Sequence, residues 1–147
     1  MKLYIAARYS RHNEMRGVAR ELESLGHTVG SRWLHADPNR SDVQAATEDI
    51  EDLRDASGLI LFTEEPNCGG RNRGGRHVEF GWALASGMEV FIVGPRENVF
   101  HYMPEVKVFD TLQRLLLHLA ERLPQVLPAE LFETSEAYDP VAAIKGR

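Results

Sequence analysis

The chain has 147 residues, a length typical of one domain, and its 43% hydrophobic and 27% charged residues are typical of a folded protein. The net charge of -5 argues against a general nucleic-acid binder, and a single cysteine, Cys68, excludes an internal disulfide and a zinc site built from cysteine pairs. No apolar run approaches the ~20 residues of a membrane helix and no signal-peptide core is present, so we expect a cytoplasmic protein with no membrane partner.

Apolar runs alternate with helical patterns along the first part of the chain. Residues 2–7 form an apolar, aromatic run that predicts a buried strand, and residues from about 10 to 25 have the spacing of a helix with one apolar face. We predict a second strand at 27–34. A capping box at Ser41 predicts a second helix, with an apolar stripe formed by Val43, Ala46, Ile50 and Leu53.

The same alternation continues to about residue 123. We predict strands at 58–62, 90–93 and 106–109, and helices over about 76–86 and 112–123. Strands that alternate with helices indicate a single α/β domain over residues 1–123, with a doubly wound, mainly parallel sheet of the Rossmann or flavodoxin-like kind and helices on both faces. Proline-punctuated residues 124–147 are predicted to form a partly disordered C-terminal arm.

Ligands of such sheets bind at the carboxyl ends of the strands. These ends are followed here by segments 8–10 and 34–39 and by a Gly/Arg-rich loop, 66–76. Neither a G-x-G-x-x-G turn nor a P-loop is present, which argues against a conventional dinucleotide or P-loop site. The histidines lack metal-binding spacings, so we expect neither a metal nor a cofactor.

One carboxylate and three arginines are candidates for chemistry in this region. Glu79 falls in the first turn of the predicted helix, where exposed amides favour the ionised form that could attack an anomeric carbon. The alternative is a glutamate that only complements the helix dipole, and Asp49 could equally be one acid on a solvated helix face. Arg71, Arg73 and Arg76 could wrap a phosphate, or form part of a solvated loop.

Three short motifs, taken in order, resemble the nucleoside 2-deoxyribosyltransferase family, whose relatives include deoxynucleoside 5′-monophosphate N-glycosidases. They are Tyr4-Ile5-Ala6-Ala7 in the first strand, Asp49 ahead of the strand at 58–62, and Glu79-Phe80-Gly81-Trp82-Ala83 followed by Ala85-Ser86-Gly87. The resemblance covers about residues 2–110. It implies an enzyme without metal or cofactor that cleaves or transfers the N-glycosidic bond of 2′-deoxyribonucleosides or their 5′-monophosphates through a covalent glycosyl-glutamate.

The resemblance also implies roles for individual residues. Glu79 matches the nucleophile, Tyr4 the residue that orients it, and Asp49 the residue that contacts the sugar and assists proton transfer at the base. We expect substrate contacts from Ala7, Arg8, Tyr9, Asp37, Arg73, Gly75 and Arg76. Position 73 holds arginine where the family has aspartate or serine, which leaves the recognition of base and phosphate open.

A later segment bears on assembly. Asn98 and His101 lie where family members supply residues to a neighbouring subunit, so the resemblance implies a homodimer or a higher homo-oligomer. The alternative for His101 is an ordinary surface histidine.

Several functions therefore stay open on the sequence alone. A transferase and a hydrolase are not distinguished, and the three arginines favour a 5′-monophosphate over a free nucleoside. A non-catalytic nucleotide-binding sensor and an N-glycosidase of NAD or a ribonucleotide are the alternatives. The combination of Tyr4, Asp49 and Glu79 favours an enzyme with a small-molecule substrate over a sensor, because a pure binder needs no nucleophile.

Overall fold

A computed structural model of the chain describes residues 1–65 and 74–123. The predicted C-terminal arm, residues 124–147, and most of the Gly/Arg-rich loop, with Arg71 and Arg73, lie outside the described residues. No helix in the described part of the chain is long and apolar enough to cross a membrane.

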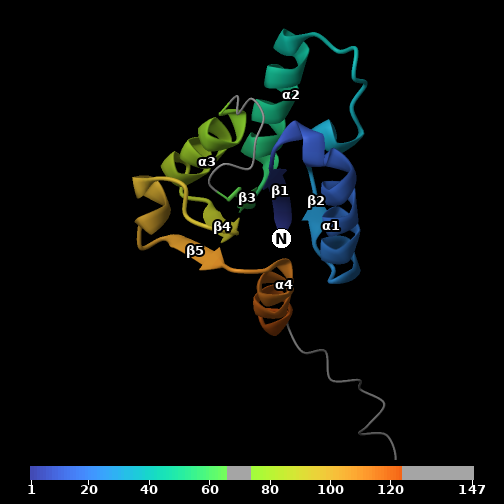
Figure 1. The fold of residues 1–147 in the computed structure, drawn as a ribbon. Helices are drawn as coiled ribbons and strands as arrows, with labels where there is room; N and C mark the ends of the chain where they lie inside the picture. The colour runs from blue at the N-terminus through green and yellow to red at the C-terminus, as the bar shows by residue number, and fades with distance from the viewer. Residues whose placement is uncertain (66–73, 124–147) are drawn as a thin grey trace, which may run out of the picture.

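The described chain forms a single five-stranded sheet in which every pairing is parallel, and this confirms the predicted α/β class (Figure 1). The strand order is β2-β1-β3-β4-β5. The strands are β1 (Lys2–Ala6), β2 (Thr28–Val29), β3 (Gly58–Phe62), β4 (Glu89–Val93) and β5 (Val106–Phe109). The helices are α1 (His12–Ser24), α2 (Asp42–Asp55), α3 (Gly75–Ala85) and α4 (Leu112–Glu121), with short 3-10 helices η1 (Tyr9–Arg11), η2 (Arg32–His35) and η3 (Val99–Tyr102).

Helices cover both faces of the sheet, as the alternating pattern predicts. The chain moves outward from β1 to β2, returns past β1 to β3, and then continues in that second direction. Because parallel crossovers are right-handed, the reversal places α1 on the opposite face from α2 and α3, which contact each other (Figure 1). The central strand β3 is buried along its whole length, in agreement with its uninterrupted apolar sequence.

The second strand is much shorter than predicted: strand structure covers Thr28–Val29 rather than residues 27–34. Side chains form hydrogen bonds with the backbone groups of β1 that would otherwise pair with a longer β2. The amide of Ile5 donates to Oγ of Ser31 at 2.7 Å, and Nε1 of Trp33 donates to the carbonyl of Ile5 at 2.8 Å. These bonds satisfy Ile5 while the chain turns into η2, so the ladder ends there.

The start of α2 agrees with the prediction, but its apolar stripe does not. Oγ of Ser41 accepts from the amide of Gln44 at 3.2 Å, as expected of an N-cap. Leu53 is buried, whereas Val43 is 78% exposed. The first turns of α2 extend past the end of the sheet (Figure 1), so no core lies beneath them.

Candidate active site

A pocket of about 800 Å³ opens at the point where the winding of the sheet reverses, between the carboxyl ends of β1 and β3. Ligands bind at such switch points in open α/β sheets, because the loops that follow the two strands diverge to opposite faces. The segment after β1, the loop after η2, one side of α2 and the start of α3 line the pocket. Its lining includes several predicted site residues: Ala7, Arg8, Tyr9, Asp37, Asp49, Gly75, Arg76 and Glu79.

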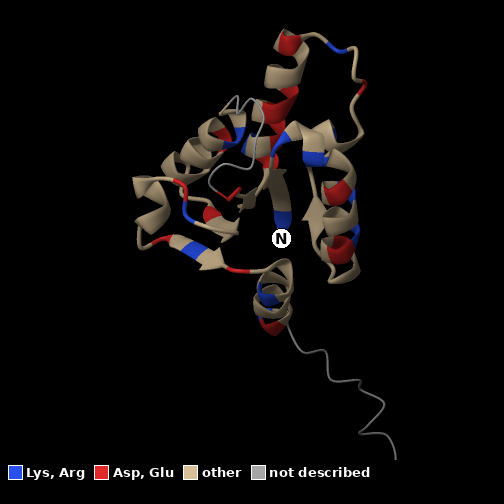
Figure 2. Cartoon of the chain, viewed as in Figure 1, with Lys and Arg blue, Asp and Glu red and all other residues tan. Residues whose placement is uncertain are grey.

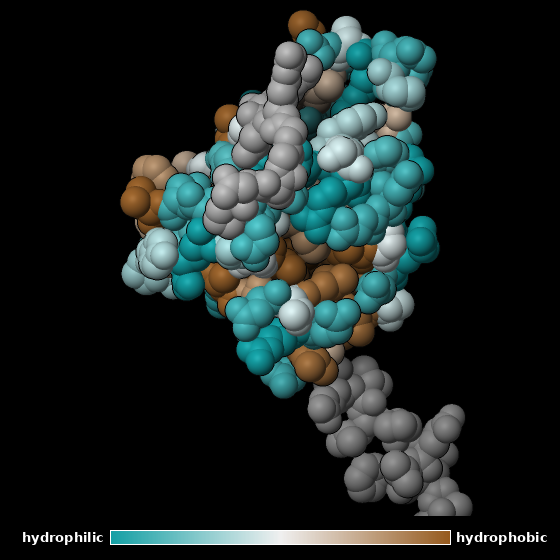
Figure 3. All heavy atoms as spheres, viewed as in Figure 1, coloured by the Kyte–Doolittle hydropathy of each residue, from teal (hydrophilic) through white to brown (hydrophobic). Residues whose placement is uncertain are grey.

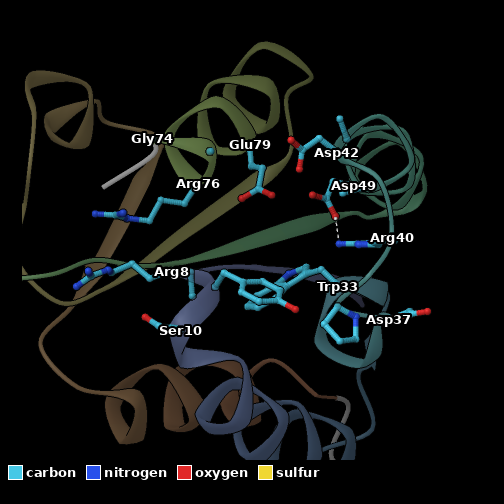
Figure 4. Close-up of a pocket in the computed structure, with 16 residues that line it drawn as sticks. Arg8, Ser10, Trp33, Asp37, Arg40, Asp42, Asp49, Gly74, Arg76 and Glu79 are labelled. Carbon is cyan, nitrogen blue, oxygen red and sulfur yellow. Dashed lines mark ion pairs between the residues drawn. The ribbon is translucent and has the colours of Figure 1, made fainter. Parts of the chain in front are cut away.

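Glu79 lies one residue deeper in its helix than predicted. The helix α3 begins at Gly75, after Gly74 at the N-cap with a φ of 73°, so Glu79 is in the second turn and not the first. Its carboxyl group points into the pocket (Figure 4). Burial raises its pKa from 4.5 to about 7, which contradicts the prediction that exposed helix-start amides favour the ionised form. A carboxyl with this pKa is ionised only in part at neutral pH.

Tyr4 lies beneath the pocket floor and holds Glu79 in place. Its side chain is fully buried in β1, and its hydroxyl donates to Oε1 of Glu79 at 2.7 Å. This hydrogen bond favours the ionised carboxylate and opposes the effect of burial on the pKa of Glu79. Burial, followed by the charge of Glu79, raises the pKa of Tyr4 well above its ordinary value, so the hydroxyl remains a donor.

Asp49 faces the same pocket from α2 and is not on a solvated helix face. Its Oδ1 is buried and accepts no hydrogen bond from the residues that the structure describes, while Nη2 of Arg40 lies 3.9 Å away. Burial raises the pKa of Asp49 against the opposing effect of Arg40. The charge of Asp49 in turn raises the pKa of Glu79. Two carboxyl groups with raised pKa values are thus close enough to influence each other, which is the arrangement that separates a nucleophile from a proton donor.

The cationic side chains of the pocket fall into two groups. In Figure 4, Arg8 and Arg76 lie on one side of Glu79, and Arg40 lies with Asp49 on the other. Nη2 of Arg76 donates to Oε1 of Glu97 at 2.7 Å, which fixes this nearly buried guanidinium beside the start of α3. In contrast to these cationic side chains, acidic residues are frequent along α2 (Figure 2).

Asn98 and His101 do not line the pocket. His101 is fully buried within the single chain, with its ring centroid 4.8 Å from that of Phe80, so the alternative of a surface histidine is wrong. Its Nδ1 accepts from the amide of Glu97 at 3.2 Å, and Oδ1 of Asn98 caps η3. The two residues are therefore linked to the pocket indirectly, through Glu97 and its bond to Arg76 and through the contact of His101 with α3. Arg73 lies outside the described residues.

The predicted site residues leave out eight residues of the pocket lining, four of which have polar or aromatic side chains: Ser10, Trp33, Arg40 and Asp42. Ser10 lies in the candidate segment 8–10 but is not singled out by the sequence. Trp33 falls inside the part of the predicted strand that is not formed, and Arg40 lies one residue beyond the candidate loop 34–39. Asp42 gives no separate signal in the sequence, because an acidic residue at a helix start is expected for electrostatic reasons alone. In the described part of the chain, no group of three or more histidine, cysteine, aspartate or glutamate residues could hold a metal ion.

Comparison with known proteins adds the fold relationship. No protein-family model and no curated protein sequence matches the chain. The CMP N-glycosidase of Clostridium botulinum matches with a TM-score of 0.59 and 19% identity, over 81% of this chain and 98% of its own. The 2-deoxyribosyltransferase of Bacillus psychrosaccharolyticus matches with a TM-score of 0.62 and 17% identity, over 79% of this chain and 90% of its own. The corresponding enzyme of Leishmania mexicana has a TM-score of 0.59 and 17% identity, over 82% of this chain and 97% of its own. The chain has the fold of these enzymes, which confirms the predicted resemblance at the level of fold.

Proposed function

We propose that this protein cleaves or transfers the N-glycosidic bond of a 2′-deoxyribonucleoside or its 5′-monophosphate, as a member of the nucleoside 2-deoxyribosyltransferase family. The observation that carries the proposal is the bond from the Tyr4 hydroxyl to Glu79, with Asp49 beside them in one pocket. A binding protein has no need for a buried carboxyl whose pKa is raised to about 7 and which a tyrosine orients.

The proposed chemistry has two steps. An oxygen of ionised Glu79 attacks C1′ of the sugar as the bond from C1′ to the base nitrogen breaks, and the electron pair of that bond goes to the base. The carboxyl group of Asp49 gives its proton to the departing base. Water or a second base then attacks C1′ of the glycosyl ester, Glu79 leaves as a carboxylate, and Asp49 takes the proton of the incoming nucleophile.

The cations beside the nucleophile support a substrate with a 5′-phosphate. Arg8 and Arg76 lie on one side of Glu79 (Figure 4), and their guanidinium groups, with the first amides of α3, could bind a dianion. A free nucleoside has no charge to bind there. The proposed preference is therefore for the monophosphate.

A panel of substrates tests the function. The purified chain is incubated with deoxyribonucleosides, their 5′-monophosphates and the matching ribonucleotides, with and without a second base, and free base is separated by chromatography. We expect release of base from at least one deoxy substrate, and faster release from its monophosphate. Exchange that requires the second base identifies a transferase, and release into water identifies a hydrolase. Binding of nucleotides without any release of base would contradict the proposal and favour the sensor.

A second candidate, a ribonucleotide N-glycosidase, has one observation in its favour: a structure with the same fold is that of a CMP N-glycosidase. Such an activity needs room for a 2′-hydroxyl beside Glu79. The same panel separates the two, because a higher kcat/KM for a ribonucleotide than for its deoxy counterpart would select this candidate.

A further inference from the structure

Arg40 is a largely buried cation in the pocket, and no step described above uses it. It follows η2, its side chain is only 10% exposed, and it lines the pocket together with Asp49 and Glu79. One end of its guanidinium forms an ion pair with Glu48 of α2, and Nη2 lies 3.9 Å from Oδ1 of Asp49. Since guanidinium has five N–H donors, these contacts leave donors for a molecule in the pocket.

The position of Arg40 fixes which part of a substrate it would meet. Glu79 lies between the Arg8 and Arg76 pair and the Arg40 and Asp49 pair (Figure 4). In the proposed reaction C1′ must lie at Glu79. A 5′-phosphate on the Arg8 and Arg76 side then places the base, on the other side of C1′, next to Arg40 and Asp49.

We propose that Arg40 is a catalytic residue that binds the departing base and stabilises the negative charge that develops on it. This inference rests on the proposed function. As the C1′–N bond breaks, its electron pair passes to the base, and one or two N–H groups of Arg40 donate to a ring nitrogen or carbonyl oxygen of that base. Arg40 keeps its own protons throughout, and the base receives its proton from Asp49. A cation that the protein already holds in position stabilises such charge with little reorganisation.

The pairing with Glu48 suggests a competing, purely structural role. In that account Arg40 only ties the loop after η2 to α2, and any loss of activity reflects a displaced loop. The two roles differ in one property. Stabilisation of developing charge matters most when the base is a poor leaving group, whereas a displaced loop slows every substrate alike.

The experiment compares two substrates of the same sugar that differ only in how readily the base leaves. If the wild-type chain releases pyrimidines in the panel, the pair is the 5-fluoro and 5-methyl pyrimidine. If it releases purines, the pair is a 2-fluoropurine and its parent purine. Fluorine withdraws electrons and makes the base the better leaving group. Single-turnover rates of base release are measured for wild type, Arg40→Leu and Arg40→Lys. Glu48→Gln is the control, since the amide that replaces the carboxylate can still accept a bond from Arg40.

We expect Arg40→Leu to slow release of the poorer leaving group about ten- to a hundredfold, as for loss of a charge-assisted hydrogen bond, and to slow the fluorinated substrate several-fold less. Arg40→Lys should fall between Arg40→Leu and wild type, and Glu48→Gln should keep the wild-type ratio of the two rates. Equal losses on both substrates, or no loss, would overturn the role of Arg40. If Arg40→Leu does not fold, the ratio in Arg40→Lys decides, because a structural role leaves that ratio at the wild-type value. If the wild-type chain releases no base at all, the proposed function fails, and this inference fails with it.

Discussion

Burial and the hydrogen bond from Tyr4 have opposite effects on the charge of Glu79, the proposed nucleophile. Burial raises the pKa of Glu79 to about 7, and the Tyr4 hydroxyl restrains that rise. Since only the ionised carboxylate attacks, kcat/KM of the wild type should have an acidic limb near pH 7. Because the proposed reaction also needs the proton of Asp49, kcat/KM should fall again at higher pH, where Asp49 is ionised. Activity therefore requires a pH at which Glu79 is ionised, and the hydrogen bond from Tyr4 lowers that pH.

The variant Tyr4→Phe tests this control. Loss of a hydrogen bond to a charged group, ~1.5–3 kcal/mol, should move the acidic limb of the pH profile upward by about one to two pH units. Activity should fall at pH 7 and recover in part at higher pH. Tyr102→Phe, a change at an exposed tyrosine, is the matched control and should leave the profile unchanged. An unshifted limb in Tyr4→Phe would show that Tyr4 does not set the charge of Glu79.

The raised pKa also has a consequence for stability. A carboxyl group whose pKa is higher in the folded than in the unfolded chain stabilises the fold while protonated, and this contribution is lost as the pH rises from 4.5 through about 7. Once ionised, Glu79 destabilises the fold by about 3 kcal/mol at most. The cost is consistent with a site selected for function over stability.

Glu79→Gln should therefore raise the free energy of unfolding at pH 8, by about 2–3 kcal/mol, and change it little at pH 5. Urea denaturation at the two pH values measures the difference. Glu23→Gln, at an exposed position of α1, should show no such pH dependence. A variant that is less stable than wild type at pH 8 would mean that ionised Glu79 does not strain the folded protein.

At the level of elements, the sequence predicts strands and helices that have a clear apolar run or capping pattern. It does not predict an end that is set by side-chain hydrogen bonds to a distant strand. The uninterrupted apolar run predicts β3 correctly, and the N-cap pattern of Ser41 predicts the start of α2. The alternation of strands and helices predicts a strand at 27–34, and the hydrogen bonds of Ser31 and Trp33 to Ile5 end it early. Such bonds join residues far apart in the chain, and no periodicity reveals them.

The role of Ser31 in ending β2 can be measured. Ser31→Ala leaves the buried amide of Ile5 without its acceptor and should lower the free energy of unfolding by about 1–3 kcal/mol. The control is Ser24→Ala, which removes an exposed hydroxyl at the end of α1 and should change stability by less than about 0.5 kcal/mol. Equal effects of the two changes in chemical denaturation would argue that the Ser31 bond does not define the end of the strand.

At the scale of the whole molecule, the winding of the sheet explains why distant motifs meet. Tyr4, Asp49 and Glu79 come from β1, α2 and α3, and the reversal between β1 and β3 brings these elements around one pocket. The family resemblance indicates these three residues from the sequence. It does not indicate Arg40, whose importance depends on a 3.9 Å approach to Asp49 that only the folded chain displays.

Assembly stays a prediction. Val99, Phe100 and Tyr102 of η3 are 77%, 61% and 71% exposed, and apolar atoms are visible in Figure 3 on the side of the molecule where η3 lies. An apolar patch of this kind is typical of a subunit interface. We expect light scattering to report at least a dimer, and Phe100→Glu to shift it toward the monomer, while Val43→Glu on the outer end of α2 should not. A wild-type monomer that is fully active would contradict the predicted assembly.

The most direct test of the whole account is the rate of base release by Glu79→Gln, measured beside the wild type and Glu23→Gln on the best substrate of the panel. The amide side chain of the Glu79→Gln variant can still accept the Tyr4 hydrogen bond but cannot form the glycosyl ester, so the variant should remain folded. We expect its rate to fall on the order of a thousandfold or more, as for a loss of several kcal/mol of transition-state stabilisation, while Glu23→Gln keeps the wild-type rate. A folded Glu79→Gln variant with near-normal turnover would show that Glu79 is not the nucleophile and that the proposed mechanism is wrong.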